Sequence, residues 1–207
     1  MLNRLASQVI PVVRTDSQAS AELAVRWLRD AGISTFEITL TTPGAVDSIA
    51  MLSADSSLLV GAGTVMSEAD VEAVVAAGAQ FVVSPVLHAD VIRRCAELGV
   101  TSICGALTPS EIALAWEYGA DAVKIFPVNS VGGAVYIKSV RDVFPDVRFI
   151  PTGGIKVAQI ADYLAAGAFA VGVGGELVNR QALATNDRAA IMTAAIAAQA
   201  AVASAAG

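Results

Sequence analysis

Ala122-Val123-Lys124-Ile125-Phe126-Pro127 is an apolar stretch interrupted by one lysine. Such a run is typical of a buried strand in a parallel sheet that helices cover on both faces. The lysine has two interpretations. If its amine stays in the interior, burial favours the neutral form, which is a nucleophile toward carbonyl carbon. If its stem lies in the core and its ammonium group reaches water, the residue carries no chemistry. The strand alone leaves both interpretations open.

Similar apolar runs precede and follow this strand along the chain. The seven further predicted strands are Val9–Val13, Thr35–Leu40, Leu58–Gly61, Phe81–Pro85, Thr101–Cys104, Arg148–Pro151 and Ala170–Val173. Helical patterns lie between them and include Ala19–Asp30, Glu68–Ala77 and Ala89–Glu97. Pro43 is expected at the first position of the second helix. Thr108-Pro109-Ser110-Glu111 has the form of a capping box, which predicts the start of another helix.

Eight strands that alternate with eight helices, roughly two dozen residues apart, predict a (β/α)8 TIM barrel. An open doubly wound sheet is the structural alternative. It is disfavoured because no Gly-x-Gly-x-x-Gly motif follows the first strand. No linker or shift in composition divides residues 1–207, so we expect the whole chain to form one domain.

The composition restricts the class of protein. A chain of 207 residues with 55% hydrophobic content can bury a sizeable core, and a net charge of −6 argues against binding to nucleic acid or an anionic membrane. Cys95 and Cys104 lack the spacing of a metal site and are expected to be reduced in a cytoplasmic protein. No signal-peptide pattern opens the sequence, and the alanine-rich stretch Ala189–Ala206 is expected to be an amphipathic helix rather than a membrane span.

The carboxyl ends of the strands form the active-site face of a TIM barrel. The sequence places there Arg14, Glu37, Thr64, Pro85, Lys124, Thr152-Gly153-Gly154 and Gly174-Gly175. The two glycine turns follow strands seven and eight, where backbone N–H groups at helix starts commonly bind phosphate. One buried amine, one carboxylate, one cation and two glycine turns therefore predict a catalytic mouth with a phosphate or carboxylate cradle. Lys138 and Lys156 are interpreted as surface charges.

Five motifs carry a family resemblance. They are Glu37-Ile38-Thr39, Gly61-Ala62-Gly63-Thr64-Val65, Ser84-Pro85, Lys124-Ile125-Phe126-Pro127 and Pro151-Thr152-Gly153-Gly154. In this order, over Val9 to Val178, the chain resembles the 2-keto-3-deoxy-6-phosphogluconate (KDPG) aldolase and 4-hydroxy-2-oxoglutarate (KHG) aldolase family. The resemblance implies a class I Schiff-base lyase of carbohydrate metabolism that cleaves KDPG, in the Entner-Doudoroff pathway, to pyruvate and glyceraldehyde 3-phosphate. It also implies a homotrimer with no cofactor. No metal is expected, because no group of His, Cys or carboxylate residues in the sequence has the spacing of a metal site.

The resemblance assigns a role to each site residue. Lys124 would form the Schiff base, and Glu37 would be the general acid and base. Arg14 would bind the substrate carboxylate. The pyruvyl pocket would be lined by Thr64, Pro85 and Thr152, with Phe126 beside the lysine. The phosphate would lie against Gly153, Gly154, Gly174 and Gly175.

The chain departs from the family pattern at two positions. Some members carry an arginine near Thr41, which this chain lacks, so Arg14 is the expected carboxylate partner. Members usually carry a serine where Gly175 stands here, followed by Glu176. Three alternatives therefore stay open. They are an aldolase for an unphosphorylated 4-hydroxy-2-keto acid such as KHG, an aldolase for the phosphogalactonate epimer, and a non-catalytic barrel that binds a phosphorylated metabolite. Thr152 favours the gluconate enzyme over the galactonate one.

Overall fold

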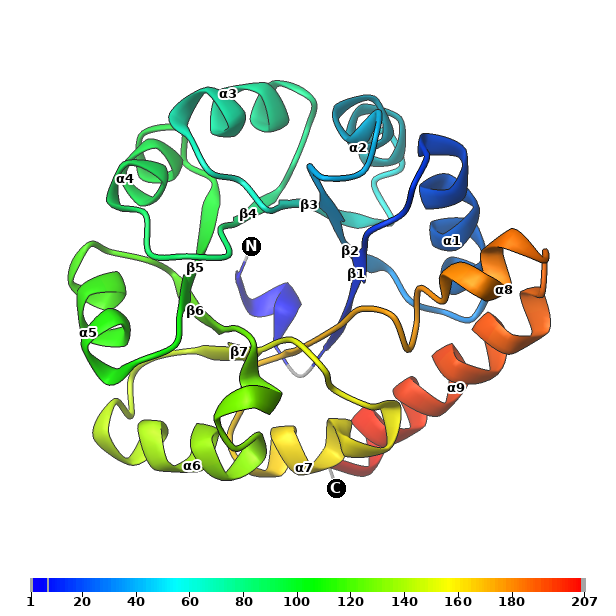
Figure 1. Ribbon diagram of the computed structural model, residues 1–207. Coiled ribbons are helices and arrows are strands. Elements are labelled where there is room, and N and C mark those ends of the chain that lie inside the picture. The colour runs from blue at the N-terminus through cyan, green and yellow to red at the C-terminus, as the bar shows by residue number, and fades with distance from the viewer. Residues whose placement is uncertain (1, 7, 206–207) are drawn as a thin grey trace.

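Eight parallel strands form one sheet in a computed structural model that describes residues 2–6 and 8–205 (Figure 1). Along the sheet the strands run in the order β7-β6-β5-β4-β3-β2-β1-β8. Their bounds are β1 Val9–Val13, β2 Thr35–Thr39, β3 Leu59–Gly63, β4 Phe81–Val83, β5 Thr101–Ala106, β6 Ala122–Ile125, β7 Phe149–Pro151 and β8 Val171–Val173. A bridge between Thr152 and Gly172 brings the two edges together, so the sheet is a nearly closed barrel. The predicted (β/α)8 barrel is confirmed.

Helices form a ring outside the strands (Figure 1). Their bounds are α1 Gln18–Asp30, α2 Ala45–Ser53, α3 Glu68–Ala76, α4 Ala89–Glu97, α5 Pro109–Glu117, α6 Ala134–Val143, α7 Ile160–Ala165, α8 Arg180–Ala184 and α9 Arg188–Ala205, with short 3-10 turns at η1 Leu2–Leu5, η2 Val128–Val131 and η3 Val157–Gln159. The predicted capping box is confirmed, because Thr108 and Glu111 satisfy each other's backbone N–H groups at the start of α5.

The start of α2 differs from the prediction. Gly44 rather than Pro43 precedes the helix, which begins at Ala45. Gly44 has a φ of 70°, a left-handed conformation that glycine adopts at little cost. The N–H of Thr42 donates to the carbonyl of Thr39, and this turn keeps Pro43 outside the helix. The placement of Pro43 at the first helical position was therefore wrong.

Two helices, α8 and α9, follow the last strand where one was expected. The second, α9, is the alanine-rich segment, and its 18 residues with a mean hydropathy of 1.3 are long and apolar enough to cross a membrane. Ile191, Ala195 and Ala198 are buried, and the helix packs against α1 and α7. The side chain of Gln199 also donates to the carbonyl of Ala31 at the end of α1. The helix therefore completes the outer ring between α7 and α1 (Figure 1).

Alternate residues of the strands point into the barrel and fill it from one end. Ile10, Leu59, Phe81 and Ile150 belong to an interior cluster that is separate from the larger core between strands and helices. Leu5 of η1 is fully buried in the same cluster, so the N-terminal turn closes the barrel at the amino ends of its strands (Figure 1). The polar interior residues lie beyond this cluster, nearer the carboxyl ends.

Candidate active site

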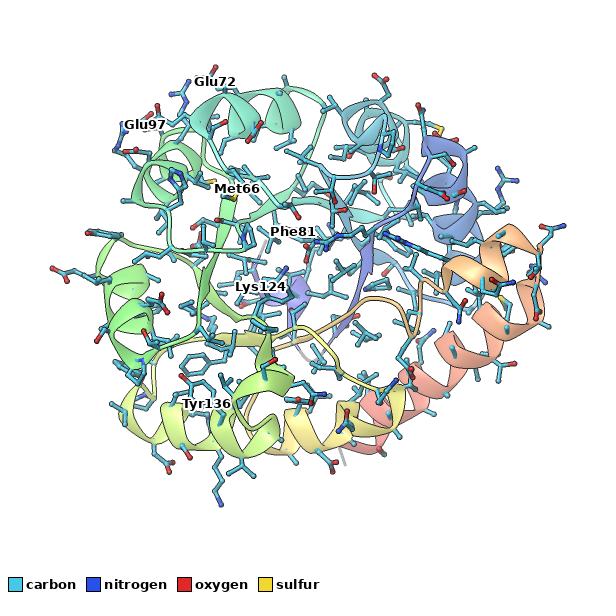
Figure 2. All side chains as sticks on the ribbon, in the orientation of Figure 1. Met66, Glu72, Phe81, Glu97, Lys124 and Tyr136 are labelled. Carbon is cyan, nitrogen blue, oxygen red and sulfur yellow. The ribbon has the colours of Figure 1, made fainter. Side chains whose placement is uncertain are left out.

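Lys124 and Glu37 meet inside the barrel. Lys124 is on β6 and Glu37 on β2, yet Nζ of the lysine lies 3.1 Å from Oε1 and 3.4 Å from Oε2 of the carboxylate. Their side chains are only 7% and 5% exposed. Figure 2 shows Lys124 near the barrel axis, whereas Glu72 and Glu97 lie at the periphery, on α3 and α4. The interpretation that the lysine reaches bulk water is therefore wrong, and the two groups satisfy each other in the interior.

Glycines make room for this pair and for the residues beside it. A β-carbon at Gly63 would overlap the carboxylate of Glu37, and one at Gly172 would overlap the hydroxyl of Thr152. Gly63 of β3 is in register with Thr39 of β2, two residues after Glu37. Gly172 of β8 pairs directly with Thr152. Glycine is therefore needed at these positions because the site residues of the next strand occupy the space.

A cavity of about 660 Å³ opens above Lys124 at the carboxyl ends of the strands. This volume is in the range of small-molecule sites. The predicted residues that line it are Arg14, Thr64, Pro85, Lys124, Phe126, Thr152, Gly153, Gly154, Gly174 and Gly175. Glu37 is not in the lining and instead lies against the lysine. The structure therefore brings together all of the residues that the sequence placed at the mouth.

The residues around the lysine are held in specific contacts. Nζ of Lys124 lies 5.7 Å from the centroid of the Phe126 ring, within the range of a cation–π contact. Nη2 of Arg14 donates to Oγ1 of Thr64 over 3.4 Å. Thr64 has a φ of 60°, which is strained for a β-branched residue. Strain of this kind concentrates at functional sites.

Further residues of the mouth, several of them charged or polar, were not identified as site residues from the sequence. Lys156, Glu176, Asn179 and Arg180 line the cavity from the loops after β7 and β8. Nζ of Lys156 lies 2.9 Å from Oε1 of Glu176, and its side chain is 66% exposed, so Lys156 is a surface charge as predicted, but one that also lines the cavity. Nε of Arg180 donates to the carbonyl of Arg14 over 3.4 Å. Their only signal in the sequence was their place shortly after the glycine turns.

The glycine turns themselves differ from the prediction in one respect. Gly153 and Gly154 have φ values of 101° and 76°, while a β-carbon at Gly174 or Gly175 would meet no atom within 4 Å. Neither pair stands at a helix start, since η3 begins at Val157 and α8 at Arg180. Any anion bound here would contact the N–H groups of loops, without the help of a long helix.

Other reactive side chains lie away from the mouth. Burial, with a smaller contribution from Asp121, raises the pKa of Cys95 to about 12, and burial also raises that of Cys104. Both thiols are therefore poor nucleophiles at neutral pH. Within residues 2–6 and 8–205, no three His, Cys, Asp or Glu side chains are grouped so that they could hold a metal ion.

Comparisons with known proteins agree with this geometry. The family model described as KDPG and KHG aldolase matches residues 3–194. A 2-dehydro-3-deoxy-phosphogluconate aldolase of Treponema pallidum is 36% identical over 87% of this chain and 86% of its own. The KHG/KDPG aldolase of Escherichia coli strain K12 is 35% identical over 86% and 84% of the two chains.

A solved structure adds a chemical parallel. The KDPG aldolase of Legionella pneumophila, with pyruvate captured as a covalent carbinolamine intermediate, superposes with a TM-score of 0.86. It is 30% identical to this chain, and the match covers 95% of this chain and 96% of that one. The barrel, the interior lysine and these matches together show that the chain belongs to the KDPG and KHG aldolase family.

Proposed function

We propose that the protein is a class I aldolase that cleaves KDPG to pyruvate and glyceraldehyde 3-phosphate. The observation that carries the proposal is the buried pair of Lys124 and Glu37, 3.1 Å apart, at the floor of a cavity at the carboxyl ends of the strands. An amine can form an imine with a ketone, and a carboxylate within hydrogen-bond reach can move the protons that imine formation requires.

The first half of the reaction forms an electron sink. Glu37 accepts a proton from Nζ of Lys124, and the neutral amine adds to the C2 carbonyl of the substrate. The resulting carbinolamine loses its hydroxyl group as water, with the proton supplied by Glu37, and leaves a cationic iminium. The iminium can accept the electron pair of the bond between C3 and C4.

The second half breaks that bond. Glu37 takes the proton of the C4 hydroxyl, C4 becomes the aldehyde carbon of glyceraldehyde 3-phosphate, and the electron pair passes to an enamine of pyruvate. Glu37 returns the proton to C3 of the enamine, which regenerates the iminium. Addition of water and expulsion of the amine then release pyruvate. A general base of this kind contributes roughly 10²–10⁴-fold to the rate, and positioning supplies much of the rest.

The remaining residues of the mouth hold the two ends of the substrate. Arg14, with Thr64 at 3.4 Å, is proposed to bind the C1 carboxylate. Pro85, Phe126 and Thr152 surround the pyruvyl carbons. At the other end the N–H groups of Gly153, Gly154, Gly174 and Gly175 are proposed to bind the phosphate.

The names of the relatives favour this reaction over the alternatives raised from the sequence. The Treponema protein is named for the phosphogluconate substrate, and the Escherichia coli protein is named for both KDPG and KHG. Because both of these relatives are named as aldolases, a barrel that only binds a metabolite is not favoured. The mechanism also requires no cofactor, because the iminium itself is the electron sink.

One experiment tests the proposal directly. The protein is incubated with pyruvate and borohydride, and peptide mass spectrometry locates the reduced adduct. We expect the adduct on Lys124, together with cleavage of KDPG at a higher kcat/KM than that of the phosphogalactonate epimer or of KHG. An adduct on Lys138 or Lys156, or no adduct at all, would contradict the Schiff-base mechanism. So would cleavage that a chelator abolishes and a divalent ion restores, because that result indicates a metal enolate.

The family resemblance also supports a homotrimer in the cytoplasm and a single domain over residues 1–207. Light scattering coupled to gel filtration tests the trimer, with an expected mass three times that of the chain. A monomer or dimer that cleaves KDPG would contradict the assembly without affecting the mechanism.

A further inference from the structure

Positive charge is concentrated at the mouth of the barrel. Arg14, Lys124, Lys156 and Arg180 line the cavity, so four of the 13 lysine and arginine residues are in one place in a chain with a net charge of −6. The only carboxylate in the lining is Glu176. In the part of the chain that the structure describes, Arg14 and Arg180 form no ion pair with a carboxylate. The mouth therefore suits a ligand with more than one negative charge.

One ion pair lies at the floor of this cavity and another at its rim, and the two pairs differ in their exposure to solvent. Lys124 and Glu37 are almost fully buried at the floor. At the rim, Lys156 and Glu176 lie 2.9 Å apart with side chains 66% and 38% exposed. Exposed ion pairs contribute little to stability, and each partner can be solvated without the other. The rim pair is therefore able to open for a ligand at little cost in stability.

The rim pair joins the two loops that carry the glycine turns. Lys156 comes two residues after Gly154, and Glu176 directly follows Gly175. An anion that accepts hydrogen bonds from these glycines would lie close to both charged side chains. The hydrogen bond from Lys156 keeps the pKa of Glu176 below its usual range, so Glu176 is charged at neutral pH and competes with the anion for the lysine.

We propose that Lys156 binds the distal anionic group of the substrate and that Glu176 is its resident counter-ion, which that group displaces. The identity of the substrate in this inference rests on the proposed function. A phosphate monoester carries close to two negative charges and three acceptor oxygens, whereas Glu176 offers one charge. Displacement of Glu176 from Lys156 is therefore most favourable for a substrate that ends in a phosphate group. It is weaker for a substrate that ends in a carboxylate and absent for one that ends in a neutral hydroxyl group. The pair determines specificity and takes no part in bond cleavage.

The proposal predicts opposite effects for the two partners. Glu176→Gln leaves Lys156 available, so the KM for KDPG should fall by roughly threefold to tenfold. Lys156→Met should raise this KM by a similar factor and leave kcat nearly unchanged. The double variant Lys156→Met/Glu176→Gln also lacks the negative charge that repels the anion. Its KM for KDPG should therefore lie between those of the parent and of Lys156→Met.

Three substrates that share the keto-acid end distinguish the chemistry of the other end. KM is measured for KDPG, for KHG with its carboxylate end, and for unphosphorylated 2-keto-3-deoxygluconate with its hydroxyl end. We expect the largest change for KDPG, a smaller one for KHG and none for the hydroxyl-ended compound. Lys138→Met on α6 and Glu117→Gln on α5 are matched controls, since both side chains are exposed and outside the cavity. Equal changes for all three substrates, or no change for KDPG, would overturn the proposal.

Binding of inorganic phosphate provides a readout that does not depend on turnover. Calorimetry on the full chain should show tighter binding in Glu176→Gln and weaker binding in Lys156→Met, with both controls like the parent. Phosphate binding that is the same in all five proteins would refute the role of Lys156. Trapping of pyruvate on Lys124 by borohydride, run on the same samples, reports separately on the proposed function, because it involves no distal group. If the parent protein traps no pyruvate, the proposed aldolase function is refuted. The phosphate-binding measurements would still test whether Lys156 binds an anion.

Discussion

Glu37 occupies the space that a side chain at Gly63 would need, and a β-carbon there would overlap its carboxylate. The two residues lie on neighbouring strands, β2 and β3, with Gly63 paired to Thr39. β2 lies between β1 and β3, so Gly63 contacts the carboxylate from the β3 side. The position of Glu37 beside Lys124 therefore depends on a glycine that takes no part in the chemistry.

Gly63→Ala should separate the catalytic pair. The new methyl group displaces the carboxylate from Nζ of Lys124, because the strand backbone is held by its neighbours on both sides. We expect kcat for KDPG to fall by roughly 10²-fold, as for loss of a general base. Overpacking should lower the free energy of unfolding by about 1–3 kcal/mol. Steady-state kinetics and urea unfolding measure the two effects, and unchanged turnover would show that Glu37 tolerates the displacement.

Lys124→Ala should abolish both cleavage and borohydride trapping, since it removes the amine that lies beside Glu37 at the cavity floor. Lys124→Arg should be inactive as well, because a guanidinium group stays protonated and cannot become the nucleophile. Mass spectrometry after reduction with pyruvate measures the adduct. Retention of the adduct in Lys124→Ala would place the Schiff base on another residue.

Glu37→Gln keeps the shape of the side chain and removes its ability to take up a proton. We expect kcat to fall by roughly 10²–10⁴-fold while the affinity for pyruvate is largely retained. Pre-steady-state kinetics with KDPG and equilibrium binding of pyruvate separate the two quantities. A change confined to affinity would make Glu37 a structural or binding group.

Gly175→Ser should be accommodated, since a β-carbon at this position meets no atom within 4 Å. The added hydroxyl group can donate to a phosphate oxygen, a hydrogen bond to a charged group worth roughly 1.5–3 kcal/mol. We expect a lower KM for KDPG and an unchanged KM for the unphosphorylated analogue. Equal gains for both compounds would show that this loop does not contact phosphate.

Alkylation of the cysteines tests the burial of the outer core. With the pKa of Cys95 raised to about 12 by burial, only a minute fraction of this residue is thiolate at pH 8. The folded protein should therefore react with iodoacetamide far more slowly than the protein unfolded in guanidinium, in which both cysteines are accessible. The reaction of Cys95 should accelerate as the pH rises toward 12. Rapid modification of Cys95 at pH 8 would show that the face between α4 and the barrel opens readily.

The sequence predicted the barrel and its catalytic floor because both follow from strand periodicity. Residues two apart on a strand share a face, so the inward positions of Glu37 and Lys124 follow once the apolar runs are identified as strands. The carboxyl ends of parallel strands share one edge, which brings the strand-end residues Arg14 and Thr152 to the same mouth.

The rim could not be predicted in the same way. Lys156 and Glu176 meet through the conformations of two loops, and loop conformation has no periodicity that sequence could reveal. The need for glycine at position 63 likewise depends on how closely β2 and β3 pack. The division of the last helical segment into α8 and α9 depends on the turn at Asn186, which has a φ of 56°.

The 3-10 turn at the amino ends of the strands has a consequence for the order of events in the reaction. Leu5 fills the interior on that side, so the two fragments of a cleaved substrate share the passage on the opposite side. The fragment bound to Lys124 is at the inner end of this passage, and the aldehyde lies between it and solvent. The aldehyde therefore departs first and the keto acid last. In the direction of synthesis the keto acid has to enter first, so the kinetics should be ordered, with the aldehyde as the second reactant.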